Sequence, residues 1–269
     1  MGSIWLIGCG NMAGAMLAGW LRAGMAPERF TVIRPSGLAP APAVRTLTKL
    51  PDSGDAPDLV MLGVKPQKLD EVAPALAPLL APRTVLVSIL AGVEIASLRA
   101  RFASPAAMVR AMPNLPVSLG HGATGLFADG ASDDVRDEIT RLMDALGLAL
   151  WVDDEDALDA VSVLGGSGPA FVYRFIDALA AAGETIGLSP DRSRRLALAT
   201  VNGAARLAAN ADESPAQLAD RVASPGGSTR RGLDALDADR ALVRLMEATL
   251  AASRERVAEM AAEARGGPA

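Results

Sequence analysis

The chain has 269 residues and half of them are apolar, so it can bury one large or two ordinary hydrophobic cores. Its formal net charge of −5 argues against a nucleic-acid partner, which requires a basic surface. The single cysteine, Cys9, excludes an intrachain disulfide and fits a reducing cytoplasm. The single histidine, His121, argues against a histidine-based metal site or catalytic triad. We therefore expect no metal site. The apolar N-terminal run is too short to span a bilayer, so we also expect no membrane segment.

The first half alternates short apolar runs with stretches of helical spacing. We expect strands at residues 4–8, 30–33, 59–64, 84–89, 107–112, 123–127 and 148–152. We expect helices at residues 12–23, 69–80 and 93–102. Apolar strands that alternate with helices indicate a parallel sheet covered on both faces. Because residues 35–42 hold three prolines, any helix after the second strand must start late or be short.

The second half shows only helical patterns, and no convincing strand follows about Ala157. We expect helices at residues 170–186, 189–209 and 239–264. The middle helix is apolar on nearly all faces and must therefore be buried. A domain of about 110 residues has difficulty burying several such helices alone. A partner chain is the simplest cover.

Residues 8–13, with the sequence GCGNMA, end the first strand and open the first helix in the pattern G-x-G-x-x-A. Gly8 permits a tight turn, Gly10 lets a pyrophosphate approach the backbone, and Ala13 lets helix and strand pack closely. The helix N-terminus then offers free N–H groups to the phosphates. The alternative is a purely structural turn. The residues expected to contact a dinucleotide here are Ile7, Gly8, Gly10, Asn11 and Met12.

The end of the second strand indicates which dinucleotide is bound. An NAD site usually places an acid there for the ribose 2′-hydroxyl, whereas this chain has Arg34, followed at two residues by Ser36. A guanidinium binds a 2′-phosphate through charge-assisted hydrogen bonds. We therefore predict NADPH as cofactor, with weaker use of NADH, and both residues as contacts. The alternative is that Arg34 is a solvated surface arginine.

Three later strands also end in turns that we expect to line the nicotinamide and its ribose. Ligands of open α/β sheets bind off the carboxyl ends of the strands. The contacts expected from these turns are Val64, Lys65, Pro66, Ala91 and Asn114. For Lys65 the alternatives are a solvated lysine or a catalytic one.

These patterns place the chain in the α/β class. We predict an N-terminal Rossmann-type doubly wound sheet that binds NADP, at residues 1–155. An all-α C-terminal domain for substrate binding and dimerisation is predicted to follow at residues 156–269.

Four further motifs lie at residues 63–67 (GVKPQ), 110–116 (RAMPNLP), 165–170 (GGSGPA) and 224–229 (SPGGST). In this order, behind the glycine-rich turn, they make the chain from about Ile4 to Met260 resemble the pyrroline-5-carboxylate reductases. The resemblance implies reduction of L-1-pyrroline-5-carboxylate to L-proline, the last step of proline biosynthesis, by NADPH. It also implies a homodimer or a larger assembly of dimers.

The chain departs from the family pattern at three positions. Leu115 replaces the usual threonine, Gly165 replaces a serine, and Arg230 stands where an apolar residue is typical. None of these changes removes a proposed catalytic group. Leu115 does weaken the case for a side-chain hydrogen bond from this turn to the nicotinamide.

The motif at residues 224–229 is the expected substrate site. Its proline ends a helix, and its glycines let successive N–H groups form a nest for the substrate carboxylate. The predicted substrate contacts are Ser224, Gly226, Gly227, Ser228 and Thr229. The Thr229 hydroxyl is the candidate catalytic group, hydrogen-bonded to the ring nitrogen. The alternative is an ordinary helix–helix connection. Residues 166–170 could pack beneath the nicotinamide or simply join the domains.

Two other functions stay open at this point. One is a different NADP-linked reductase, either of the two-domain β-hydroxyacid dehydrogenase type or specific for another cyclic imine. The other is a non-catalytic NADP-binding sensor, which would need Gly8, Gly10 and Arg34 but not the motif at residues 224–229.

Overall fold

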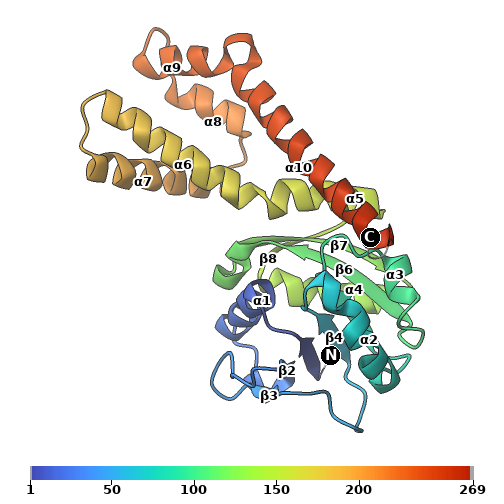
Figure 1. Ribbon diagram of the computed structural model, residues 1–269. Helices are drawn as coiled ribbons and strands as arrows, with labels where there is room; N and C mark the ends of the chain where they lie inside the picture. Colours follow the sequence, from blue (N-terminus) through green and yellow to red (C-terminus); the bar gives the residue numbers. More distant parts are fainter. Residues whose placement is uncertain (1, 267–269) are drawn as a thin grey trace. The chain divides into compact units, whose positions relative to one another are not determined.

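The computed structural model describes residues 2–266 and divides into two compact units (Figure 1). The sheet unit comprises the chain up to Pro169 together with the chain from Ser253 onward. The helical unit comprises Ala170–Ala252. The domain boundary predicted between residues 155 and 156 stays a prediction.

The sheet unit is built on an eight-stranded sheet of order β3-β2-β1-β4-β5-β6-β7-β8. The strands are β1 (Ile4–Ile7), β2 (Phe30–Ile33), β3 (Arg45–Leu47), β4 (Leu59–Leu62), β5 (Val85–Ser88), β6 (Ala107–Pro113), β7 (Gly122–Asp129) and β8 (Gly147–Trp151). In β2, β4, β5 and β6 every residue is buried, as both-face coverage of a parallel sheet requires. The predicted Rossmann-type, doubly wound architecture is confirmed.

One feature of this sheet differs from the expectation of a wholly parallel sheet. β7 runs antiparallel to β6, and β8 runs parallel to β7, so the last two strands are reversed. The chain also has no helix in the described segment between β2 and β4. The short edge strand β3 takes that place, because the prolines of residues 35–42 prevent a helix there.

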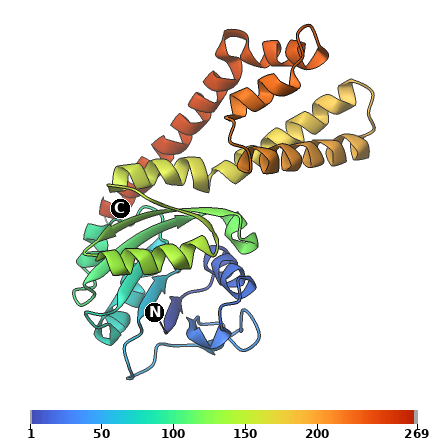
Figure 2. The same cartoon turned by 180° about the vertical axis from the view of Figure 1, so that it is seen from behind.

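Helices cover both faces of the sheet and enclose two separate cores. α1 (Asn11–Arg22) and α4 (Asp133–Asp144) pack on one face, which Figure 2 shows from the side of α4. α2 (Leu69–Leu76) and α3 (Ile95–Arg99) pack on the other. Alternate residues of each strand serve the two cores, as the two-residue period of a strand dictates: Leu6 faces α1, and Ile7 faces α2.

Trp20 of α1 joins three elements at the centre of the first core. Its ring stacks on Phe30 of β2 at a centroid distance of 5.6 Å. Its indole N–H donates to the carbonyl oxygen of Leu142 in α4, at 2.8 Å. This fully buried tryptophan therefore holds the first helix, and the glycine-rich turn that precedes it, in place on the sheet.

Shorter helical segments complete the sheet unit. They are η1 (Pro27–Arg29), η2 (Pro66–Lys68), η3 (Ala77–Leu79), η4 (Leu115–Leu119), α5 (Glu155–Val161) and the π-helical turn η5 (Ser162–Gly166). The side chain of Asp154 caps α5 by accepting from the N–H of Ala157 at 2.7 Å.

The helical unit contains no strand among its residues, as expected. Its helices are α6 (Gly168–Thr185), α7 (Pro190–Ala209), α8 (Pro215–Val222), α9 (Ser228–Asp237), η6 (Ala238–Arg240) and the first part of α10 (Ala241–Gly266). α6 and α7 pack through small side chains, and an added Cβ at Gly183 would lie 2.9 Å from Ser193 Oγ. Its buried residues are few: Ala180, Ser193, Ala197 and Ala223. No helix in the described part of the chain is long and apolar enough to cross a membrane.

Candidate functional site

The turn after β1 requires glycine at its first position. Gly8 has a φ of +83°, and its N–H donates to the carbonyl oxygen of Ile33 at 2.8 Å. A Cβ added at Gly8 would lie 2.9 Å from the carbonyl oxygen of Gly63 and 3.0 Å from Val64 Cγ1. The turn after β1 therefore lies directly against the turn after β4, with no room for a side chain between them.

The second glycine of the turn has a different surrounding. Gly10 is exposed, and a Cβ added to it would meet no atom within 4 Å. It precedes α1, which has no side-chain cap and no acid in its first turn. The first N–H groups of α1 therefore remain available beside open space, which fits the pyrophosphate of a dinucleotide.

Arg34 lies beside this turn, at the end of the neighbouring strand. Its N–H donates to the carbonyl oxygen of Leu47 at 2.9 Å, which holds the backbone in the sheet. Its guanidinium has no hydrogen bond or ion pair within the described residues. Burial raises the pKa of the nearby Cys9 thiol, and the positive charge of Arg34 opposes this shift. Ser36 is exposed, and its Oγ accepts from the N–H of Leu38 at 3.4 Å. An unpaired cation next to the glycine-rich turn fits a 2′-phosphate.

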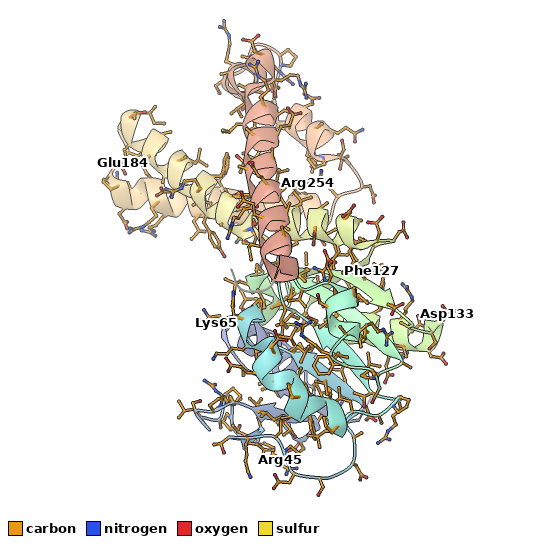
Figure 3. The ribbon with its side chains drawn as sticks, turned by 45° about the vertical axis from the view of Figure 1, so that its right-hand side comes forward. Arg45, Lys65, Phe127, Asp133, Glu184 and Arg254 are labelled. Atoms are coloured by element: carbon orange, nitrogen blue, oxygen red, sulfur yellow. The ribbon has the colours of Figure 1, made fainter. Side chains whose placement is uncertain are left out.

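The turns that follow β4 and β5 share the same edge, because the strand ends are in register. Ile7 is paired with Leu62 and Leu62 with Ser88. Lys65 precedes η2 with its side chain exposed (Figure 3). Ala91 is also exposed. The arrangement therefore brings the predicted contacts from β1, β2, β4 and β5 to one edge of the sheet.

Several of the predicted contacts at this edge are less accessible. Ile7 is buried in the core, and Val64 and Pro66 are half-buried. Asn11 and Met12 form the first turn of α1, where Asn11 is exposed and Met12 is half-buried. Their role as cofactor contacts stays a prediction, which for Ile7 concerns the backbone rather than the side chain.

Asn114 directly follows β6, and its side chain makes hydrogen bonds within the protein. Its Nδ2 donates to the carbonyl oxygen of Gly165 at 2.8 Å, and its Oδ1 accepts from the N–H of Ala123 at 2.9 Å. The side chain is 7% exposed. It thus joins β6, β7 and η5, a role that the sequence did not reveal. Its contact with a cofactor stays a prediction.

The expected substrate loop belongs to the helical unit and joins α8 to α9. Gly226 has a φ of +73°, and the N–H of Gly227 donates to the carbonyl oxygen of Ser224 at 2.9 Å. Gly227 precedes α9 without a side-chain cap, and no acid lies in the first turn. Ser228 and Thr229 are exposed. The loop therefore presents free N–H groups and two hydroxyls, which suits a carboxylate ligand.

The three departures from the family pattern are accommodated without loss of any of these features. Arg230 forms an ion pair with Asp220 at 2.7 Å, so its charge is directed to α8 rather than to the loop. Leu115 is half-exposed at the start of η4. Gly165 serves through its carbonyl, and the nearest atom to an added Cβ is 3.9 Å away.

Sequence reasoning assigned no role to Arg110, which is almost fully buried in β6. Its guanidinium pairs with Glu155 at 2.6 Å and with Asp159 at 3.4 Å, both on α5. The signal that could have found it is a charged residue inside the apolar run of residues 107–112. No group of side chains in the described part of the chain has the composition of a metal site.

The two glycines of the turn should respond differently to substitution by alanine. Gly10→Ala should leave the thermal midpoint near wild type but weaken NADPH binding by about tenfold or more, since the methyl group fills the space next to the phosphates. Gly8→Ala should instead lower stability by more than about 2 kcal/mol, through its positive φ and its contact with Gly63. Thermal denaturation and cofactor titration of both variants check this. Loss of stability without loss of affinity in Gly10→Ala would contradict it.

Comparison with known proteins agrees with this geometry. A family model described as NADP oxidoreductase, coenzyme F420-dependent, matches residues 3–92, and one described as pyrroline-5-carboxylate reductase dimerisation matches residues 155–260. The chain is 37% identical to the pyrroline-5-carboxylate reductase of Pseudomonas aeruginosa, over 95% of both chains. It is 36% identical to that of Glycine max, over 92% of both.

Solved structures give the same result. A pyrroline-5-carboxylate reductase from Coxiella burnetii superposes with a TM-score of 0.89 at 32% identity, covering 96% of this chain and 98% of the other. The Plasmodium falciparum pyrroline carboxylate reductase with NADP bound gives 0.80 at 25% identity, with the same coverage. The chain belongs to the pyrroline-5-carboxylate reductase family.

Proposed function

We propose that this protein reduces L-1-pyrroline-5-carboxylate to L-proline with NADPH, as the last step of proline biosynthesis. The observation that carries the proposal is that one chain, similar to these reductases over 95% of its length, retains both the uncapped glycine-rich turn with Arg34 and the loop Ser224–Thr229. A cofactor-binding sensor would need only the first of these. Its place in a reducing cytoplasm is part of the proposal and rests on the single cysteine.

The chemistry asks little of the protein beyond alignment. Bound NADPH would supply a hydride for the carbon of the C=N bond, and the ring nitrogen would already carry its proton, so the product would be the secondary amine. The first N–H groups of α1 and Arg34 would hold the phosphates, while the N–H groups at the start of α9 would hold the substrate carboxylate. Thr229 Oγ accepts a hydrogen bond from the protonated nitrogen. An iminium is already electrophilic, so the reaction needs no metal or nucleophile.

The direct test is the oxidation of NADPH in the presence of pyrroline-5-carboxylate. We expect rapid loss of the NADPH absorbance with this substrate and formation of proline. Oxidation with 2-keto acids but not with the imine would favour a β-hydroxyacid dehydrogenase. Binding of NADPH with no turnover of either substrate class would favour a sensor.

Cofactor preference should depend on Arg34. Arg34→Ala should weaken NADPH binding by roughly 1.5–3 kcal/mol, about 10- to 100-fold, because the 2′-phosphate loses a charge-assisted partner. Binding of NADH, which is weaker in the wild type, should hardly change. Lys49→Ala removes an exposed positive charge paired with Asp52 and serves as the control. Equal losses for both cofactors in Arg34→Ala would contradict the assignment.

The loop hydroxyls should contribute unequally to catalysis. Thr229→Val keeps the shape of the side chain and removes its hydrogen bond, so kcat/KM for the imine should fall by about 10²–10³. NADPH affinity should stay near wild type. Ser228→Ala, a matched removal of the neighbouring hydroxyl, should have a much smaller effect because its N–H remains. If Thr229→Val kept more than about a third of wild-type kcat/KM, the loop would serve only to hold the carboxylate.

The helical unit includes part of a dimerisation domain by family likeness, and we propose that it pairs with a second copy of this chain. Supporting this, large apolar side chains on α6 and α7 are exposed in the single chain: Val172, Tyr173, Phe175, Leu179, Leu196, Leu198 and Leu207. α10 adds Leu242, Val243, Leu245 and Met246. So much exposed apolar surface on one small unit is typical of an interface. Higher assembly of such dimers is implied only by the family resemblance.

We expect at least a dimer in solution, with an interface above the ~2,000 Å² typical of obligate pairs. Light scattering across a dilution series measures this. Phe175→Glu, which places a charge in the exposed apolar set, should shift the equilibrium toward monomer. Glu184→Gln, a change at an exposed residue of the same helix, should not. A stable, active wild-type monomer at low concentration would refute the proposal.

A further inference from the structure

Arg110 is a charged residue in the interior of the sheet unit. It lies in the middle of β6, is 1% exposed, and is one of the largest fully buried side chains of the molecule. Burial of a lone cation is strongly unfavourable, so its partners must be fixed. Nη1 lies 2.6 Å from Glu155 Oε1, and Nη2 lies 3.4 Å from Asp159 Oδ1. The two acids stand one turn apart on α5 and form the other half of this ion network.

Glu155 extends the network to a third element. The same Oε1 that accepts from Arg110 also accepts from the N–H of Ile95, at 3.1 Å. Ile95 is the first residue of α3, which has no side-chain cap of its own. A carboxylate from α5 therefore caps the start of α3 and fixes the chain only three residues after Gly92.

The segment fixed in this way is the turn after β5. Gly92 has a φ of +72°, and the preceding residue, Ala91, is exposed at the edge of the sheet where the dinucleotide is expected. Ala91 and Gly92 line a small cavity of about 20 Å³ together with Arg110 and Asp159. The turn and the ion network thus share one cavity, while Ala91 is also exposed to solvent.

Two features mark the network as more than a passive ion pair. Arg110 Nε is buried without a hydrogen-bond partner in the described structure, although it belongs to a residue lining this cavity. Burial raises the pKa of Asp159 although the positive charge of Arg110 opposes the shift, because this carboxyl has lost part of its contact with water. A cavity of this size can hold one water molecule, which could satisfy such groups. Stability alone is a weak reason to keep a buried ion network of this kind.

The network is also remote from the adenine half of the expected site. The adenine and 2′-phosphate side is formed by β1 and β2, whereas β5 and β6 follow β4 on the other side of β1. Loosening of the turn after β5 should therefore disturb the nicotinamide half of the dinucleotide and leave the adenine half held by Arg34.

We propose that Glu155 is a positioning residue that fixes the turn at Ala91 and Gly92 for the nicotinamide half of the cofactor. Arg110 and Asp159 form the ion network that holds Glu155 in place. The proposal rests on the proposed use of NADPH. It assigns Glu155 no contact with the cofactor or the substrate: its oxygen holds the backbone that does.

The test compares two ligands in the full-length protein. NADPH spans both halves of the site, whereas adenosine 2′,5′-bisphosphate carries the adenosine and the 2′-phosphate but no nicotinamide. Glu155→Ala should weaken NADPH binding by about tenfold and lower kcat by a similar factor. Its affinity for adenosine 2′,5′-bisphosphate should stay within about twofold of wild type. Glu155→Gln, which keeps an oxygen for Ile95, should show the same pattern with a smaller loss.

Asp156→Ala is the matched control, since it removes an exposed carboxylate from the adjacent position of the same helix. It should change neither affinity. Equal loss of both ligands in the Glu155 variants would assign the network to general stability and overturn the proposal, as would no loss of either. If Glu155→Ala fails to fold, the ratio of the two affinities in Glu155→Gln decides. Because both affinities are measured without turnover, failure to reduce pyrroline-5-carboxylate would overturn the proposed function and leave this test intact.

Discussion

The close contact between Gly8 and Gly63 is the constraint on which the arrangement of the sheet edge depends. The two residues follow adjacent parallel strands, and a Cβ added to either would lie 2.9–3.1 Å from the carbonyl oxygen of the other, so neither turn has room for a side chain at that point. An added Cβ at Gly63 would in turn lie 2.9 Å from the Cβ of Ala13. Strand, turn and helix are thereby packed tightly together, whereas the space next to Gly10, at the start of α1, stays open.

The two units are stabilised by different interactions. The sheet unit encloses two cores, and its elements are also joined by specific polar contacts such as Trp20 to Leu142 and Asn114 to Gly165. The helical unit buries few of its own side chains and relies on small residues where α6 meets α7. Because burial of apolar area supplies most of the stability of a small domain, we expect the helical unit to become more stable when its apolar side chains are covered.

Much of this fold could be predicted because its signals are local. These signals act through neighbouring residues: the apolar run of β1, the glycine pattern of residues 8–13 and the proline that opens α7. The sequence therefore predicts β1, α1 and α7 to within a residue or two. The reversal of β7 could not be predicted, because an apolar strand reads the same in either direction. The strand β3 was missed because its three residues carry no alternating pattern.

The candidate site was predictable to a similar extent and for the same reason. Gly8, Gly10 and Arg34 can be identified from their residue type and their fixed distance from a strand. The second role of Asn114 depends on Gly165 and Ala123, which are brought to it only by the folded sheet. Arg110 gave a signal as a charge within an apolar run, but its acidic partners lie 45 and 49 residues away.

The π-helical turn η5 limits the insertions and deletions that this part of the chain can accept. In it the N–H of Ser167 reaches the carbonyl oxygen of Ser162, five residues back, so the turn holds one residue more than an α-helical turn would. Removing or adding a single residue between α5 and Gly165 would carry the carbonyl of Gly165 away from Asn114, because each residue turns a helix by about 100°. Side chains, by contrast, have room here, since an added Cβ would meet no atom nearer than 3.6 Å at Gly165, Gly166 or Gly168. In the single chain, the three glycines therefore leave room for a methyl group, whereas the number of residues in the turn is fixed by the contact between Gly165 and Asn114.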